Sequence, residues 1–149
     1  MKPENNTAKK YKIDHYSALP DATREIRIEV FVEEQGFIEE FDATDDVSTH
    51  FLVFDGDRAV ATCRIFPSEK KGSYTLGRFA VRKEYRGQGL GASLLSAAEE
   101  YVRKVNGDRL VLHAQCAAQG FYEKCGYTAY GEIEYEQDCP HTQMKKSLC

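Results

Sequence analysis

Residues 85–95 read YRGQGLGASLL and place an arginine and three glycines directly before a run with helical spacing. The N-terminus of a helix leaves about four backbone N–H groups without partners, and the aligned peptide dipoles put roughly half a positive charge there. Glycines in the preceding turn let the backbone approach an anion closely, and Arg86 adds a charge with bidentate donors. The segment therefore predicts a binding site for phosphate groups.

Three kinds of phosphate ligand compete for this segment. A Walker loop requires Gly-Lys-Ser/Thr after its glycines, and GLGAS contains no lysine, which disfavours nucleotide hydrolysis. Gly87, Gly89 and Ala92 do satisfy the dinucleotide pattern G-x-G-x-x-A, but in that fold the glycines follow a strand at once, whereas residues 82–86 intervene here. Coenzyme A, held by its pyrophosphate, is the third ligand.

The length and composition fit a single domain over residues 1–149, with residues 1–10 as a frayed N-terminus. No apolar run approaches the roughly 20 residues of a membrane span, and the N-terminus has no signal-peptide pattern. The formal net charge of −4 and the scarcity of basic clusters argue against nucleic-acid binding. We expect a cytoplasmic protein with neither a membrane nor a nucleic-acid partner.

The five cysteines are an odd number and contain no C-x-x-C pair, so they indicate neither a zinc site nor a redox dithiol. We expect reduced thiols and no bound metal.

Hydrophobic periodicity predicts the elements in front of the glycine segment. A strand at residues 11–16 is followed by a helix that begins at Pro20 and Asp21 and ends near Glu34. Next comes an acidic loop with room for a short helical turn. Its carboxylates belong to Glu39, Glu40, Asp42, Asp45 and Asp46. A hairpin over residues 50–67 and a strand over residues 74–81 then complete a three-stranded meander.

The elements behind the glycine segment follow the same reasoning. A helix runs from Leu90 to a stop at residues 106–108, and a short apolar strand occupies residues 109–115. A short helix is then stopped by Gly126, and two closing strands lie at residues 128–136 and 141–144. These closing strands could pair between subunits, which predicts a homodimer as one option.

Several segments together resemble the GNAT superfamily of acetyl-CoA-dependent N-acetyltransferases. RGQGLG, at residues 86–91, is similar to the R/Q-x-x-G-x-G/A pyrophosphate loop of that family. LGRFAV is similar to its splayed central strand, LVLHAQ to the strand after the helix, and GFYEKCGY to its late F-Y-E-K-x-G-F/Y motif. VFVEEQ, at residues 30–35, together with His50, resembles the ElaA-like branch.

The resemblance implies a fold and a cosubstrate. The fold would be α/β of the α+β kind, with a mixed, mostly antiparallel central sheet that is splayed at the acetyl-CoA site and flanked by helices. Backbone groups of Phe79, Ala80 and Val81 would pair with the pantetheine arm. The residues expected to hold the pyrophosphate or to begin the helix beside it are Arg86, Gly87, Gln88, Gly89, Leu90, Gly91 and Ala92.

The resemblance also implies direct transfer of the acetyl group to a primary amine, with Tyr122 as the general acid for the departing thiolate. An amine with a pKa of about 10.4 is neutral in only about one molecule in a few thousand at pH 7, so a base is useful. We take Glu34 as the candidate base. The alternatives are Glu33, Asp45, Asp46 and His50, and the acidic loop could instead attract a cationic amine.

Three other possibilities stay open. His113 and Cys116 raise the possibility of a cysteine nucleophile and an acyl-enzyme, although Cys116 lies beyond the end of the predicted strand. A non-catalytic sensor that binds acetyl-CoA or coenzyme A would keep the glycine loop without turnover. A dinucleotide-binding oxidoreductase is the third. The sequence does not identify the amine acceptor, because acceptor choice lies in loop shapes.

Overall fold

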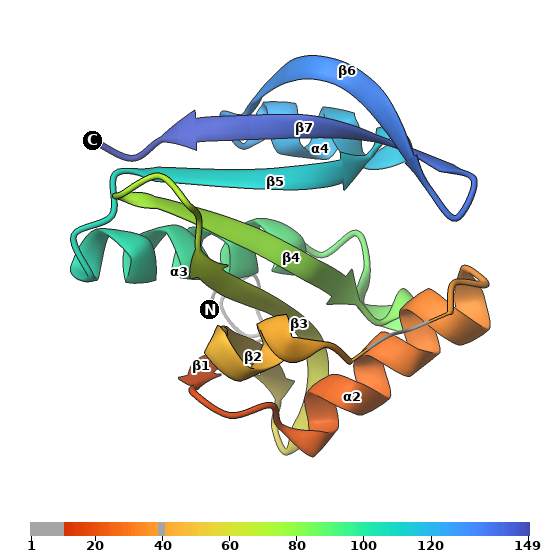
Figure 1. The fold of residues 1–149 in the computed structure, drawn as a ribbon. Helices are drawn as coiled ribbons and strands as arrows, with labels where there is room; N and C mark the ends of the chain where they lie inside the picture. Colours follow the sequence, from red (N-terminus) through yellow and green to blue (C-terminus); the bar gives the residue numbers. More distant parts are fainter. Residues whose placement is uncertain (1–10, 39–40) are drawn as a thin grey trace, which may run out of the picture.

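The computed structural model describes residues 11–38 and 41–149, and a seven-stranded sheet runs through them (Figure 1). Its strand order is β1-β2-β3-β4-β5-β7-β6, and every neighbouring pair is antiparallel except β4 and β5. The strands are β1 (Lys12–Tyr16), β2 (Thr49–Asp55), β3 (Arg58–Pro67), β4 (Ser73–Val81), β5 (Arg109–Gln115), β6 (Thr128–Glu136) and β7 (Cys139–Ser147). This confirms the predicted mixed, mostly antiparallel sheet.

Helices cover both faces of the sheet. Figure 1 shows α2 (Asp21–Arg27) in front of it, and α3 (Leu90–Lys104) and α4 (Gln119–Lys124) behind it. Short 3-10 turns lie at Ala43–Val47, Lys83–Tyr85 and Cys116–Ala118. The first of these is the helical turn expected in the acidic loop, of which Glu39 and Glu40 lie outside the described residues.

The helix that the sequence places between Pro20 and Glu34 changes its hydrogen bonding halfway. After Arg27 it continues as a π-helix over Ile28–Glu34, and the backbone N–H of Gln35 then donates to the Val30 carbonyl at 3.1 Å. Side-chain periodicity cannot reveal this widening, because the apolar residues still recur at helical spacing. Wide turns of this kind occur often at functional sites, and Phe31 in this one and Gln35 directly after it line a cavity.

The core holds the glycine segment in place through α3. One face of this helix is buried against the sheet, with Leu94, Ala98 and Val102 fully covered at a spacing of four residues. Burial of one leucine side chain contributes about 1.5–3 kcal/mol, so this face fixes both the position and the rotation of the helix. On the opposite face of the sheet, Ile26 and Val30 pack against Leu52 and form a smaller apolar cluster.

The sheet opens between β4 and β5. Their pairing extends only from Ser73–Arg109 to Leu76–Leu112, a run of four residue pairs, and beyond it the strands diverge, as Figure 1 shows. An irregularity between Thr62 and Arg64 in the pairing of β3 with β4 lies where the divergence begins. Arg78, on the facing stretch of β4, has a φ of 50°, in the left-handed region. The predicted splay is therefore confirmed, with a local change of backbone direction behind it.

No helix in the described part of the chain is long and apolar enough to cross a membrane.

Candidate active site

A groove of about 430 Å³ lies where β4 leaves β5, beside the N-terminus of α3. Its lining residues are Val30, Gln35, Phe79, Ala80, Val81, Tyr85, Arg86, Gly87, Gly89, Leu90, Gly91, Ala92 and Phe121. The structure thus brings together every residue that the sequence assigns to the cosubstrate except Gln88. The side chain of Gln88 instead accepts a hydrogen bond from the Tyr11 hydroxyl at 2.8 Å.

Gly87 and Gly89 have φ values of 78° and 83°, a conformation that L-residues with a side chain rarely adopt. A Cβ built at either position meets no atom within 4 Å, so these two glycines are required by backbone conformation and not by packing. Gly91 differs, because a Cβ there would lie only 3.2 Å from Cζ of Phe121. The turn therefore presents bare backbone to the groove at the positive end of a 15-residue helix.

The edge of β4 that faces the groove is unpaired. Ala80 and Val81 pair with Thr62 and Ala61 of β3 on one side, and the pairing with β5 has already ended at Leu76. The backbone here can accept an extended ligand in the way that a sheet edge accepts a strand. The groove thus offers an extended edge at one end and an anion site at the other, which fits a pantetheine arm joined to a pyrophosphate.

Arg86 is held by two partners. Its Nε donates to the Val81 carbonyl at 2.9 Å, and its Nη2 donates to Oε1 of Glu34 at 2.7 Å, with Nη1 bonded to the second carboxylate oxygen. The hydrogen bond from Arg86 lowers the pKa of Glu34, and the same bond raises the pKa of Arg86. A carboxylate with a lowered pKa is a weaker base. The pairing also makes Glu34 a competitor for any anion that Arg86 would bind.

We expect Glu34→Gln to tighten coenzyme A binding by about three- to tenfold at low salt, because it removes a negative charge beside the anion site. An amide oxygen would still accept a hydrogen bond from Arg86. Calorimetric titration at two ionic strengths measures the change, with Glu100→Gln as the control, since Glu100 pairs with Arg103 on the exposed side of α3. A hundredfold loss of kcat would instead establish Glu34 as the base that the sequence suggests.

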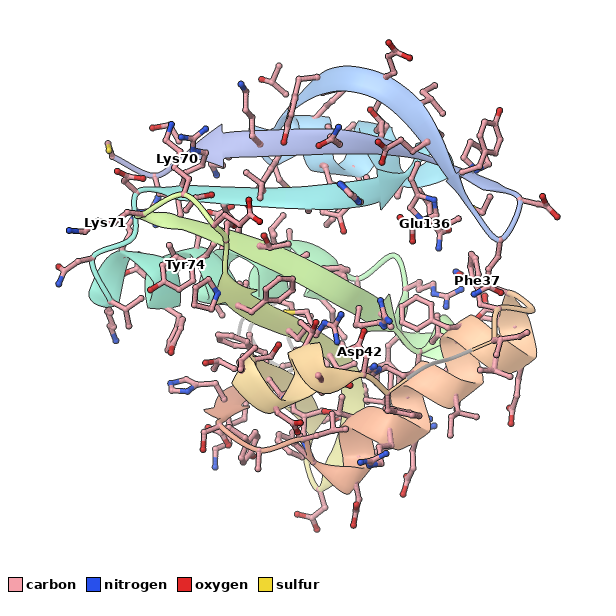
Figure 2. The ribbon with its side chains drawn as sticks, in the orientation of Figure 1. Phe37, Asp42, Lys70, Lys71, Tyr74 and Glu136 are labelled. Carbon is pink, nitrogen blue, oxygen red and sulfur yellow. The ribbon has the colours of Figure 1, made fainter. Side chains whose placement is uncertain are left out.

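A second cavity, of about 610 Å³, lies on the other side of the opening between β4 and β5. Phe37, after the π-helical segment, and Glu136, at the end of β6, line it where these two parts of the chain meet (Figure 2). The backbone N–H of Ile38 donates to Oε1 of Gln137 at 3.0 Å, and Nε2 of Gln115 donates to Oε1 of Gln35 at 2.9 Å. Two side-chain contacts thus bridge the opening.

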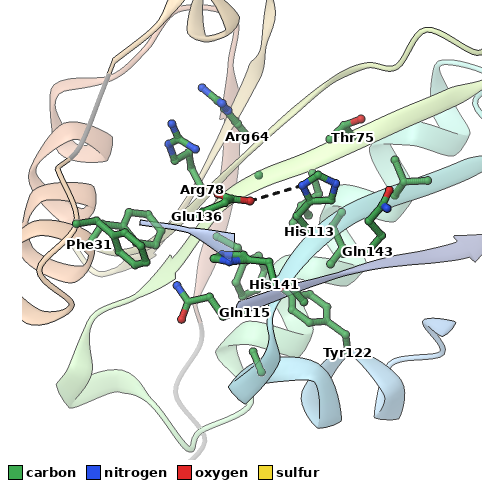
Figure 3. Close-up of a pocket in the computed structure, with 18 of the residues that line it drawn as sticks. Phe31, Arg64, Thr75, Arg78, His113, Gln115, Tyr122, Glu136, His141 and Gln143 are labelled. Atoms are coloured by element: carbon green, nitrogen blue, oxygen red, sulfur yellow. Dashed lines mark ion pairs between the residues drawn. The ribbon is translucent and has the colours of Figure 1, made fainter. Parts of the chain in front are cut away.

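Tyr122 of α4 lines this second cavity and is only 6% exposed (Figure 3). Its ring packs against those of Phe121 and Phe79, with centroid distances of 5.0 and 6.0 Å, and both of these residues also line the groove. Its hydroxyl has no hydrogen-bond partner among the described residues. Burial raises the pKa of the phenol, so the group keeps its proton at neutral pH.

His141 of β7 lines the same cavity and was not singled out by the sequence. The residue is 7% exposed, and Nδ1 lies 2.9 Å from the Cys139 carbonyl oxygen. A carbonyl only accepts, so Nδ1 must carry the hydrogen, which leaves Nε2 of the neutral ring as an acceptor. His141 lies opposite Gln115 in the pairing of β5 with β7. If that register had been known, the alternation of side chains along the two strands could have indicated His141 as a residue beside Gln115.

The other candidate bases lie elsewhere. His50 is fully buried, and its Nε2 bonds to the Asp45 carbonyl at 2.9 Å, while burial lowers its pKa. The Asp45 carboxylate is bound by Arg27 and Arg64 at 3.0 and 2.8 Å. Asp46 and Glu33 line neither cavity. Some described carboxylates of the acidic loop contact arginines, and these carboxylates thus anchor the loop.

The proposed cysteine route receives no support from the geometry. His113 faces Glu136, with Nδ1 3.6 Å from Oε2, and Cys116 lies in the turn after β5 without lining either cavity. Among the described residues no group of three His, Cys, Asp or Glu side chains is arranged to hold a metal ion.

Comparisons with known proteins agree with this geometry. Residues 18–148 match the family model described as "Acetyltransferase (GNAT) domain". The chain is 36% identical over 124 residues to the uncharacterized N-acetyltransferase YjcF of Bacillus subtilis, which covers 81% of this chain and 87% of that protein. Two crystal structures share the fold. Escherichia coli ElaA has a TM-score of 0.79 at 29% identity, covering 92% of this chain and 98% of that one. An acyl-CoA N-acyltransferase from Pseudomonas aeruginosa has a TM-score of 0.80 at 27% identity, covering 93% and 99%.

Proposed function

Since the chain belongs to the GNAT acetyltransferase family, and is therefore an acyltransferase that uses an acyl-CoA donor and an amine acceptor, we propose that it transfers an acetyl group from acetyl-CoA to a primary amine. The observation that carries this proposal is the alignment of the open edge of β4 with the glycine turn in one groove. Tyr122 lies between this groove and the second cavity, where we place the acceptor.

On the donor side, the chain supplies backbone groups. The unpaired edge at Phe79, Ala80 and Val81 would hold the pantetheine arm, and the N–H groups from Arg86 to Ala92 would hold the pyrophosphate. Acetyl-CoA would bring the thioester to the site. A backbone N–H of β4, at Phe79 or Val81, would polarise the thioester carbonyl. Gln88 would contribute its backbone alone, because its side chain is bonded to Tyr11.

On the acceptor side, two protons must move. As the amine nitrogen bonds to the acetyl carbon and the carbon–sulfur bond breaks, Tyr122 would donate its proton to the departing sulfur. Burial raises the pKa of Tyr122, and it would raise that of a thiolate beside it in the same way, so the transfer is not disfavoured by the site. Nε2 of His141 would accept the proton that the amine loses, either directly or through water. We favour His141 over Glu34, because the Glu34 carboxylate is bound to Arg86.

We expect His141→Gln to lower kcat about a hundredfold, the usual loss when a general base is removed. His15→Gln is the matched control, because His15 lies exposed on β1 and packs against Tyr101 with a centroid distance of 5.1 Å. Unchanged rates would remove His141 from the mechanism.

Thermal shifts with acetyl-CoA, coenzyme A and NADH, followed by thiol release with a panel of amines, test the function as a whole. We expect both coenzyme A species to stabilise the protein, NADH to leave it unchanged, and at least one amine to release the thiol. Stabilisation without thiol release would indicate the sensor module, and stabilisation by NADH alone would indicate the dinucleotide-binding oxidoreductase.

The predictions of a single domain, a cytoplasmic location and a homodimer stay predictions. All five cysteines are free thiols, which suits a reducing compartment. β6 forms the outer edge of the sheet and exposes Ile133 and Tyr135, so this edge is the place where pairing between subunits is to be sought.

A further inference from the structure

We infer that the amine acceptor also carries an anionic group, a carboxylate or a phosphate, and that Arg64 and Arg78 bind this group in the second cavity. The inference rests on the proposed function and adds the chemical class of the acceptor. Both arginines line the cavity and lie together at one end of it, whereas Tyr122 lies further along the same space (Figure 3).

Arg64 of β3 is buried and only partly satisfied. Its Nη1 donates to Oδ1 of Asp42 at 3.1 Å and to Oδ1 of Asp45 at 2.8 Å. Its Nη2 has no hydrogen-bond partner among the described residues, and Nε is a buried donor that also lacks one. Only 7% of the side chain is exposed, and Nε, which is itself buried, loses its hydration and gains no protein partner in return. An unpartnered buried donor is costly, and a ligand is one way to satisfy it.

The two unused donors are adjacent on the guanidinium group. Nε and Nη2 form the side edge of arginine, which binds a carboxylate or a phosphate through two parallel hydrogen bonds. Gly77 lies beside this edge, where a Cβ would be in van der Waals contact with Nε at 3.6 Å. The Phe66 ring lies 5.5 Å from the Arg64 guanidinium carbon and limits its movement. An anion in the cavity would therefore meet an arginine whose guanidinium group is held in place.

Arg78 adds a second positive charge at this end. Its backbone is in the left-handed region, and its Nη2 lies 3.9 Å from Oδ2 of Asp42. Arg64 and Arg78 thus share the carboxylate of Asp42, which is 43% exposed. A second ammonium group, as in a polyamine, would be repelled here.

The remaining charge in the cavity suits the amine end of the same molecule. Glu136 is the one carboxylate among the described lining residues, and it is paired only loosely with His113, at 3.6 Å. An incoming ammonium group can bind near Glu136 before it loses its proton. Phe31 and Phe37 supply apolar walls. The lining therefore matches a small amino acid or amino phosphate with an apolar body.

Matched pairs of amines test this inference by thiol release. Phenylalanine is compared with phenylalaninamide, ethanolamine phosphate with ethanolamine, and diaminopropane serves as the dication. We expect kcat/KM to be at least about tenfold higher for the anionic member of a pair, as a charge-assisted bidentate contact implies. The pair with the larger ratio distinguishes a carboxylate from a phosphate. Equal rates within both pairs, or a preference for diaminopropane, would overturn the inference and leave the acetyltransferase proposal intact.

Variants test whether the two arginines cause the preference for the anionic amine. Arg78→Gln and Arg64→Lys should bring the ratio within each pair close to one, whereas Arg58→Gln should leave it unchanged, because Arg58 is exposed and paired with Glu84. Arg78→Gln retains the buried contacts of Asp45. This variant therefore tests the inference even if Arg64→Lys fails to fold.

Binding measurements distinguish the inference about the anion site from the acetyltransferase proposal. If no amine releases the thiol, the acetyltransferase proposal fails, and calorimetry with phenylalanine and ethanolamine phosphate then tests the anion site alone. Binding that is lost in Arg78→Gln would support the site, and the absence of binding to the wild-type protein would overturn it.

Discussion

Gly89→Asp is expected to weaken coenzyme A binding at least about a thousandfold, through lost hydrogen bonds, charge repulsion and backbone strain together. Gly89 has a φ of 83° and lies directly before the first turn of α3, where it lines the groove. An aspartate side chain would stand between the backbone N–H groups and the pyrophosphate, and its charge would repel the ligand. Calorimetric titration with coenzyme A measures the loss.

Gly56→Asp is the control for the strain in this experiment. Gly56 has a φ of 60°, a Cβ there also meets nothing within 4 Å, and it lies in the turn between β2 and β3, away from the groove. Both variants should lower the melting temperature by similar amounts, but Gly56→Asp should bind coenzyme A normally. If Gly89→Asp keeps its affinity, the glycine turn is not the pyrophosphate site.

Tyr122→Phe is expected to lower kcat about a thousandfold while the affinity for acetyl-CoA changes little, because only the proton donor is removed. The phenylalanine ring would keep the contacts with Phe121 and Phe79, so the shape of the site is retained. Steady-state rates at saturating substrates, together with calorimetry, separate the two effects. Equal rates for both proteins would exclude Tyr122 as the acid.

The control for this variant is Tyr127→Phe. Tyr127 packs against Tyr122 with a centroid distance of 5.9 Å, but its hydroxyl donates to Oε2 of the buried Glu99 at 2.7 Å. Its loss should lower the melting temperature, since a buried carboxylate loses a partner, and should leave kcat close to that of the wild type.

Local patterns predicted most of the fold and most of the residues that line the groove beside α3. The helical spacing of apolar residues, among them Leu94, Ala98 and Val102, predicts α3. The glycines before this helix indicate a turn of bare backbone by their residue type alone. The groove residues are close in sequence, at 79–81 and 86–92, so the order of strand, turn and helix brings them together. Patterns within short stretches of sequence were enough to predict these groove residues. The relatives named above confirm the family that the patterns indicated.

The acceptor side could not be predicted in the same way, because its residues come from elements far apart in the chain. Arg64 and His141 come to line one cavity only when the registers of β3, β5 and β7 are fixed, whereas Tyr122 is indicated by the family motif that contains it. The pairing of Glu34 with Arg86 joins residues that are 52 positions apart. The assignment of Glu34 as the base stays a prediction, and its contact with Arg86 could be seen only in the structure.

The short junction between β4 and β5 bears on the lifetime of the protein. Besides the core under α3, four residue pairs and a few side-chain bridges join the two parts of the sheet, and a donor arm bound along β4 would complete the sheet as a missing strand. A ligand that binds only the folded state stabilises it in proportion to the logarithm of its concentration. Resistance to proteolysis, and with it the amount of enzyme in the cell, would then rise and fall with the supply of coenzyme A.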